Sequence, residues 1–275
     1  MTVESRVPAP APARTGRRAA IGVATLRTDR WWAQPAFTFG VLMSFIIYST
    51  WAAFVDRDYF WEPYLSPFYS PCIATRCGMV PGSAGAPHVG IFGSWWIISP
   101  AVIILIVPLG FRLTCYYYRK AYYRAFWLAP PACAVAEPHA RYTGETRFPL
   151  ILQNVHRYFF YLGFLLNIIL SYDAVIAFRD HSGRWGHAGL GTLVLVLNAL
   201  LLWGYTLSCH SCRNIVGGRL NHFSKHPLRY RFWTLVSRMN RYHGQIAWVS
   251  LVWVALADLY VRLVAAGWIT DVRFF

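Results

Sequence analysis

Charged residues are scarce in this chain of 275 residues: 13% of the residues are charged, whereas 56% are hydrophobic and 17% are aromatic. So low a share of charge excludes a soluble domain of this length. Several apolar runs are long enough for a helix that crosses a hydrocarbon core of about 30 Å. Because only helices and closed barrels satisfy the backbone in lipid, and these runs have helical length, the sequence predicts an all-α integral membrane bundle.

Five transmembrane helices are expected within one membrane domain that covers residues 36–275. We place these helices at about 36–55, 91–115, 150–178, 188–212 and 233–267. Residues 1–35 are rich in Pro, Ala and Arg and are expected to form a flexible, basic cytoplasmic leader. A short apolar core near the start, which a cleavable signal requires, is missing, so the first helix is expected to be retained.

Acidic residues are also few, with 11 Asp and Glu against 26 Lys and Arg, for a net charge of +15. With five crossings, the leader and the segments 112–157 and 211–243 lie on one side, and they hold 20 of the 26 cations. This asymmetry predicts a cytoplasmic N-terminus and an outer C-terminus in a multi-pass plasma-membrane protein. It also argues against nucleic acid and favours anionic lipid or an acidic face of a docked protein as the partner.

The chain has only six cysteines, and the predicted topology divides them. Cys72 and Cys77 lie in the outer loop 56–92, where an oxidising exterior permits a disulfide, although two free thiols remain an alternative. The other four are Cys115, Cys133, Cys209 and Cys212, which lie on the inner side and are expected to stay reduced or to bind a metal.

The first predicted helix contains neither Cys nor His, whereas the other four place such residues near their inner ends. These residues are Cys115, His156, Cys209, His210, Cys212 and His243. Residues three apart on a helix share one face, so Cys209 and Cys212 can reach one metal, while His210 points about 100° away.

Two thiolates with two imidazoles suit a tetrahedral zinc or a Rieske-type [2Fe–2S] centre, in which Cys₂ binds one iron and His₂ the other. The expected ligands are Cys209, Cys212, His156 and His243, with Cys115 as a possible substitute for one histidine. The usual soluble Rieske spacing is absent, so this hypothesis depends on composition and depth. Haem b with His156 and His243 as axial ligands is the alternative, and it leaves the cysteine pair unexplained.

The aromatic stretch "CYYYRKAYYRAFW", residues 115–127, follows the second predicted helix. It is typical of an aromatic belt with snorkelling cations at the headgroup level. It also suits a wall for a quinone head beside a docked subunit, because Tyr and Arg donate hydrogen bonds from an apolar body. The expected quinone or partner surface comprises Tyr116, Tyr118, Arg119, Arg238 and Tyr242.

Two other classes of function fit parts of the sequence. A transporter could use Asp173, Asp258 and Arg262 along a path, but transporters often have internal repeats, and we find none. Asp258 and Arg262 are four apart and can simply pair on one helix face. A thiol oxidoreductase could use Cys209 and Cys212, although such pairs usually lie near oxidising space and this one is on the inner side.

Four stretches resemble one known family: "TCYYYRKAYYRAFW", "LQNVHRYFFYLGF", "LSCHSCRN" and "RYHGQIAWVSL". They are similar to the single-chain membrane anchor of actinobacterial succinate dehydrogenase, over most of the chain from about residue 30. The resemblance implies partner flavoprotein and iron–sulfur subunits, of which the first oxidises succinate. It also implies electron transfer to quinone, with menaquinone expected for this lineage. The oligomeric state is left open, including a higher oligomer.

The sequence departs from the haem-bearing five-helix relatives of this family, whose histidines on four helices ligate two haems. The first predicted helix and the body of the second contain no histidine here. A cluster of Cys and His stands where the resemblance places the inner haem. This departure favours an iron–sulfur centre over haem.

Overall fold

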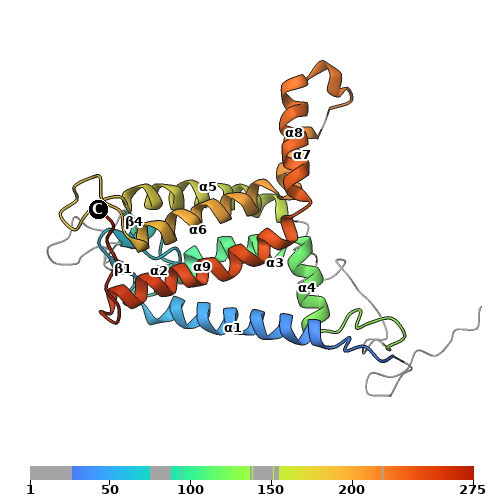
Figure 1. The fold of residues 1–275 in the computed structure, drawn as a ribbon, viewed down its shortest axis with the longest axis horizontal. Helices are drawn as coiled ribbons and strands as arrows, with labels where there is room; N and C mark the ends of the chain where they lie inside the picture. The colour runs from blue at the N-terminus through green and yellow to red at the C-terminus, as the bar shows by residue number, and fades with distance from the viewer. Residues whose placement is uncertain are drawn as a thin grey trace, which may run out of the picture.

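The computed structural model describes residues 27–74, 88–93, 95–136, 138, 151, 155–218 and 220–275. Four long helices lie side by side in a bundle: α1 (Ala33–Val55), α5 (His156–Ile176), α6 (Leu190–Leu207) and α9 (His243–Ala265) (Figure 1). Each is long and apolar enough to cross a membrane. Beside them lie the shorter α2 (Pro100–Ile104) and α3 (Ile106–Leu113), which with the bent continuation α4 form a candidate fifth span.

The two ends of the bundle differ. At one end α4 (Tyr116–Phe126) turns by 85° away from the helix that precedes it. At the same end α7 (His210–Gly217), the short helix η3 (Phe223–Lys225) and α8 (Pro227–Asn240) form a hairpin that projects across the bundle direction (Figure 1). We call this the α4 end.

The opposite end, which we call the loop end, carries all the strands in the described part of the chain. Strand β1 (Phe60–Trp61) pairs antiparallel with β2 (Tyr64–Leu65), and β3 (Cys72–Ala74) pairs parallel with β4 (His88–Phe92). The C-terminus lies at this end as well (Figure 1). Short strands here close the loop between α1 and α2 over the bundle.

Several helix boundaries differ from the predicted ones because apolar length does not record where the backbone turns. The predicted helix 91–115 begins only at Pro100, and the predicted start at 150 lies six residues before His156. The predicted helix 188–212 is divided by the break between α6 and α7, and the predicted helix 233–267 is divided by the break between α8 and α9. The predicted helix 36–55 corresponds to α1. Proline at the first helical position explains the late start, since its missing N–H costs nothing there.

Small residues let α3 approach α5 closely. A Cβ at Gly110 would lie 2.1 Å from the Phe159 ring, and a Cβ at Gly163 would lie 2.9 Å from the Phe111 ring. Glycine at such contacts is typical of packed membrane helices. In lipid the hydrophobic effect does not drive helices together, so they associate through close packing at small residues. The close approach brings the start of α5 to the end of α3.

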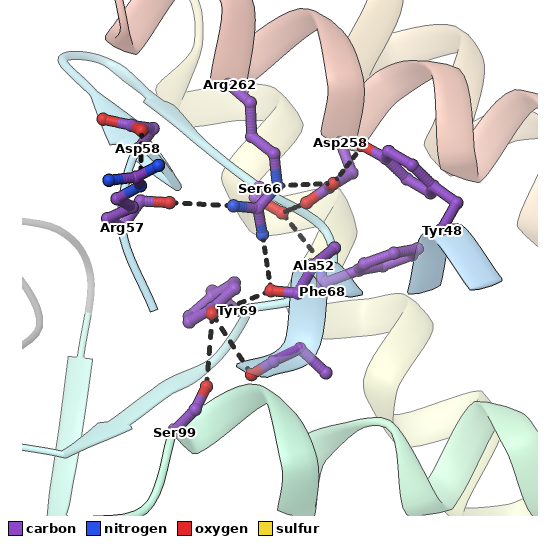
Figure 2. Close-up of polar contacts among 11 residues, drawn as sticks. Tyr48, Ala52, Arg57, Asp58, Ser66, Phe68, Tyr69, Ser99, Asp258 and Arg262 are labelled. Carbon is purple, nitrogen blue, oxygen red and sulfur yellow. Dashed lines mark hydrogen bonds and ion pairs between the residues drawn. The ribbon is translucent and has the colours of Figure 1, made fainter. Parts of the chain in front are cut away.

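The loop end is pinned to α9 by a buried ion pair (Figure 2). Arg262 lies 2.8 Å from Asp258, which confirms that these residues pair one turn apart. The carboxylate also accepts hydrogen bonds from Tyr48 on α1, at 2.5 Å, and from Ser66 in the loop. The guanidinium in turn donates to the carbonyl of Ala52 at 2.9 Å. The pair therefore joins α1, α9 and the loop.

Other side chains of the same loop reach the remaining helices. Ser70 donates a hydrogen bond to the buried Asp173 on α5, and Tyr64 donates to Asp271 at 2.8 Å, near the C-terminus. Cys72 is disulfide-bonded. Its predicted partner, Cys77, lies outside the described residues, so that pairing stays a prediction.

Candidate metal centre

Four side chains with soft or borderline donors meet at helix breaks near the α4 end. Cys115 precedes α4 and Cys209 precedes α7, and both have extended backbone, with ψ of 133° and 148°. His156 is the first residue of α5, and His243 is the first residue of α9. Because each break turns the chain at the same depth, residues distant in sequence converge there.

Each histidine contacts one cysteine. The Nε2 atom of His156 lies 3.1 Å from the Sγ atom of Cys209, and the Nε2 atom of His243 lies 3.5 Å from the Sγ atom of Cys115. Both thiols and His243 are almost fully buried. The four residues line one cavity of about 230 Å³, together with Thr114, Tyr116, Arg119 and His210.

The hydroxyl of Thr114 fixes the tautomer of His156. This hydroxyl donates its single hydrogen to the carbonyl of Gly110 at 2.7 Å. It therefore accepts from the Nδ1 atom of His156, which lies 2.8 Å away. A neutral imidazole protonated on Nδ1 has its lone pair on Nε2. That lone pair faces the sulfur of Cys209.

Ser208 does the same for His243. Its hydroxyl donates to the carbonyl of Tyr205 at 3.1 Å and accepts from the Nδ1 atom of His243 at 2.7 Å. The Tyr205 ring stacks on His243 with 4.9 Å between ring centres, and Phe111 stacks on His156 at 5.1 Å. The two histidines thus have matched surroundings, with a hydroxyl on one nitrogen, a thiol on the other and an aromatic ring on one face.

A short sequence repeat underlies this match. Residues 111–119 read FRLTCYYYR and residues 205–213 read YTLSCHSCR, so both follow the pattern aromatic-x-Leu-(Ser/Thr)-Cys-x-x-x-Arg. The contacts are crossed, since each histidine touches the hydroxyl of one copy and the thiol of the other. This nine-residue match is far shorter than the multi-helix repeats of transporters.

Cys212 does not reach the cavity. It is buried on α7, does not line the cavity and has no hydrogen bond to either histidine within the part of the chain described. The prediction that Cys209 and Cys212 share a face assumes one continuous helix. Cys209 instead caps α7 with extended backbone, so the three-residue spacing does not apply. Cys115, which the sequence offers as a possible substitute for one histidine, lines the cavity, and the ligand set itself stays a prediction.

His210 and the predicted surface residues separate into three groups. His210, Tyr116 and Arg119 line the rim of the cavity. Tyr118 is buried and donates to the carbonyl of Ala247 at 2.5 Å. The other two, Arg238 and Tyr242, are exposed beside the break between α8 and α9 and do not line the cavity.

A second, mainly apolar cavity of about 340 Å³ lies within the bundle, between the metal-ligand candidates and the loop end. Its polar wall near the α4 end comprises Arg112, Tyr118 and Tyr205. Arg112 donates to the Tyr118 hydroxyl, and its guanidinium carbon lies 4.8 Å from the centre of the Tyr205 ring. The Tyr205 hydroxyl is buried without a hydrogen-bond partner among the described residues.

Arg112 is a residue that the sequence-based analysis missed. Its signal is a cation within the apolar run that forms α2 and α3, since ionisable residues at membrane depth are functional candidates by default. It also donates to Ser250 on α9 at 3.2 Å. Arg112 thus links the end of α3 to α9 beside the cavity.

The four candidate ligands do not converge on a single point. Among the described residues, no group of three or more His, Cys, Asp or Glu side chains has the geometry to hold one metal ion. The contacts are instead those of two separate Cys–His pairs that face one cavity.

Two findings relate this chain to known proteins. The family described as actinobacterial succinate dehydrogenase subunit SdhC matches residues 33–267. A chain of the Mycobacterium smegmatis Sdh1 complex in the apo form shares 54% sequence identity with a TM-score of 0.82, covering 95% of this chain and 98% of that one. No curated protein matches. The chain therefore belongs to the family of actinobacterial succinate dehydrogenase subunit SdhC, the multi-pass plasma-membrane anchor of a succinate:quinone oxidoreductase.

Proposed function

We propose that this chain passes electrons from the iron–sulfur subunit to quinone through a Rieske-type [2Fe–2S] centre held by Cys115, Cys209, His156 and His243. The observation that carries the proposal is the buried cavity onto which two thiols and two imidazoles open from four helix breaks. Two sulfur and two nitrogen donors are the ligand set of this type of centre. Among the described residues no three of these donors reach one point, which disfavours a tetrahedral zinc, a site that needs four ligands on a single ion.

Side chains beside the cavity orient the two candidate histidine ligands. Thr114 and Ser208 hold the Nε2 lone pairs toward the cavity, and such second hydrogen bonds orient metal-ligating histidines in general. Phe111 and Tyr205 cover one face of each imidazole and exclude water. When bound, the centre supplies one-electron transfer, and imidazole ligation raises its reduction potential relative to four thiolates.

We place the α4 end at the cytoplasmic face, with α2 and α3 as the fifth span and α4 near the membrane surface. Described cations support this placement: of the 18 described Lys and Arg residues, 11 lie at the end of α3, on α4, at the start of α5 or in the segment from α7 to Arg241. The exposed Tyr116, Arg238 and Tyr242 and the half-buried Arg119 are proposed to face the iron–sulfur subunit. The flavoprotein subunit lies beyond it.

The apolar cavity within the bundle suits a quinone. Its apolar wall can take an isoprenoid chain, and its polar wall places the unpartnered hydroxyl of Tyr205 beside Arg112 and Tyr118. A quinone carbonyl is an acceptor that these donors can satisfy. Tyr205 also stacks on His243, so a quinone head in this wall lies next to the proposed centre. Menaquinone stays the expected quinone.

The alternatives have less support. Haem ligation needs both Nε2 atoms to face a flat cavity, whereas here each faces a thiol. Transport along Asp173 and Asp258 needs mobile polar groups, whereas both carboxylates are held by serine hydroxyls of the loop.

The test compares cysteine variants in the intact complex. In Cys115→Ser and Cys209→Ser, the cluster is expected to be lost, because a hydroxyl is a poor ligand for a soft metal site. Cys212→Ser is the matched control and is expected to keep the cluster. Electron paramagnetic resonance of the reduced complex, with iron and acid-labile sulfide analysis, measures the centre directly.

Succinate oxidation with a soluble dye is the internal control, because it reports the soluble subunits alone. Loss of the centre in Cys212→Ser together with retention in Cys115→Ser would restore the ligand set expected from sequence. A haem absorption band that disappears in His156→Ala and His243→Ala, with no iron–sulfur signal in the parent, would overturn the proposal.

A further inference from the structure

A third cavity lies between α7, α8 and the start of α5, and it shares only His210 with the Cys–His cavity. Its volume is about 540 Å³. It is lined by Arg157, His210, Ser211, Arg213, Asn214, Gly217, Gly218 and Trp233. No acidic residue is among them, and the sequence contains no Asp or Glu between Asp180 and Asp258. The cavity therefore carries positive charge with no carboxylate of its own hairpin to neutralise it.

Each of the two arginines uses only part of its guanidinium group for contacts within the protein, which leaves N–H donors for a ligand. Arg157 donates through one Nη atom to the side-chain oxygen of Asn214 at 3.5 Å. Arg213 donates through Nε to Ser237 at 3.0 Å, and its guanidinium carbon lies 5.1 Å from the centre of the Trp233 ring. The Nη atoms of Arg213 have no acceptor among the described residues. Planar guanidinium groups with free Nη atoms are well suited to phosphate.

The hairpin that holds the cavity is tightly closed. A Cβ at Gly217 would lie 2.1 Å from the Trp233 ring, so only glycine permits this contact. Arg229 donates through Nε to the carbonyl of Val216 at 3.0 Å and so ties α8 to the end of α7. A site whose walls are fixed before binding loses little entropy when a ligand arrives.

The outer side of α8 carries an apolar stripe. Leu228, Phe232 and Leu235 follow the spacing i, i+4, i+7, which places them on one helix face, and their exposed fractions are 65%, 53% and 54%. Arg231 and Arg238 are exposed along the edge of this stripe. The hairpin projects from the α4 end across the bundle direction (Figure 1). A helix of this pattern lies in the plane of a membrane surface.

We infer that this cavity binds the phosphate of an anionic phospholipid from the inner leaflet, with the acyl chains beside the apolar stripe of α8. The inference depends on the orientation in the proposed function, because the hairpin must lie at the headgroup level. Free phosphate can pair with the arginines but does not cover the apolar stripe of α8. An acidic protein segment likewise leaves that stripe uncovered. A phospholipid satisfies both features. Basic pockets on the cytoplasmic side of membrane helices bind such headgroups.

The test measures lipid retention by the intact complex. The complex is delipidated in detergent, incubated with phosphatidylglycerol or phosphatidylcholine and analysed by native mass spectrometry. The parent is expected to retain phosphatidylglycerol selectively. Arg157→Gln/Arg213→Gln is expected to retain it about 30-fold less, since each cation near an anionic surface contributes a factor of roughly five. Leu228→Ser/Phe232→Ser is expected to weaken retention as well.

A charge-matched control removes two exposed cations that neither line the cavity nor border the stripe, Lys225→Gln/Arg241→Gln. If this control loses as much phosphatidylglycerol as the cavity variant, the attraction is diffuse and the site is rejected. Full competition by millimolar inorganic phosphate, with no effect of Leu228→Ser/Phe232→Ser, would show a site for the free anion instead.

A third outcome also overturns the inference: loss of the iron–sulfur subunit from the cavity variant while lipid retention is unchanged identifies a protein contact. Restoration of lipid retention by Arg157→Lys/Arg213→Lys separates lost charge from misfolding. The cluster signal is recorded on every sample, so failure of the lipid site is distinguished from failure of the proposed electron path.

Discussion

A hydroxyl group one residue before each cavity cysteine decides which nitrogen of the opposing histidine faces the sulfur atoms. Thr114 and Ser208 each donate to a carbonyl of their own helix and so become acceptors for Nδ1. The histidines then present unprotonated Nε2 atoms to the cavity. A hydroxyl residue that precedes one candidate cysteine ligand in the sequence thereby orients the candidate histidine ligand on another helix.

Removal of these hydroxyls is expected to weaken the metal centre without removing a ligand. Thr114→Val and Ser208→Ala should each accelerate iron loss to a chelator by about 10- to 100-fold, the usual effect of deleting such a hydrogen bond. The measurement is the decay of the reduced cluster signal in the purified complex. Thr234→Val is the control, because its hydroxyl bonds only to Tyr230 of its own helix. Equal decay in all three variants would contradict the role assigned to the hydroxyls.

At the scale of elements, α9 is tied to α1 and the loop by one buried ion pair. Asp258 is fully buried and Arg262 is 4% exposed, so neither charge is stabilised by water. Breaking such a pair leaves an uncompensated charge, whereas replacing both partners by apolar residues is often tolerated. A second Asp–Arg pair of the same spacing, Asp180 and Arg184, lies at 2.9 Å in an exposed loop and serves as an internal comparison.

Arg262→Met is expected to destabilise the bundle by about 3–5 kcal/mol, the cost of leaving a buried carboxylate alone. Asp258→Leu/Arg262→Met should recover part of this loss, since no charge remains but the carbonyls of Ala52 and Arg57 each lose the hydrogen bond that Arg262 donates. Arg184→Met should change stability by less than about 1 kcal/mol. Unfolding of the complex in detergent measures all three. If Arg262→Met leaves the stability of the complex unchanged, the ion pair is not a structural anchor.

At the scale of the whole molecule, the two ends of the bundle carry different chemistry. The α4 end holds the Cys–His cavity, the basic hairpin and the exposed free cysteine Cys133, whereas the loop end holds the disulfide-bonded Cys72. Disulfides persist in oxidising space and free thiols in reducing space. This division agrees with the cytoplasmic placement that the distribution of cations predicts for the α4 end.

A membrane-impermeant maleimide tests this sidedness. Cys133 is expected to react in inverted membrane vesicles but not in intact cells stripped of their outer layers. Ser182→Cys, in the exposed loop between α5 and α6, is expected to show the opposite pattern. Labelling in detergent confirms that each thiol is reactive. Reaction of the Ser182→Cys variant only in inverted vesicles would reverse the topology.

The sequence by itself determined the apolar lengths, the side of the cations and the residue types of the site. Hydropathy and charge are sums over a segment, so they can be read from the sequence even when the positions of the backbone turns are unknown. The common depth of His156, His243 and Cys209 could be predicted because it follows from the segments that hold them, and they line one cavity; their role as ligands stays a prediction. The pairing of Asp258 with Arg262 was found because helical spacing is local.

Only the tertiary structure decided which cysteines face the cavity. The choice of Cys115 over Cys212 depends on the backbone at Cys209, which is extended and ends the helix that the spacing rule assumes. The roles of Thr114, Ser208 and Arg112 depend on contacts between helices. Such contacts are set by how whole helices pack, and the direction of a chain after a break is a property of that packing rather than of any local pattern.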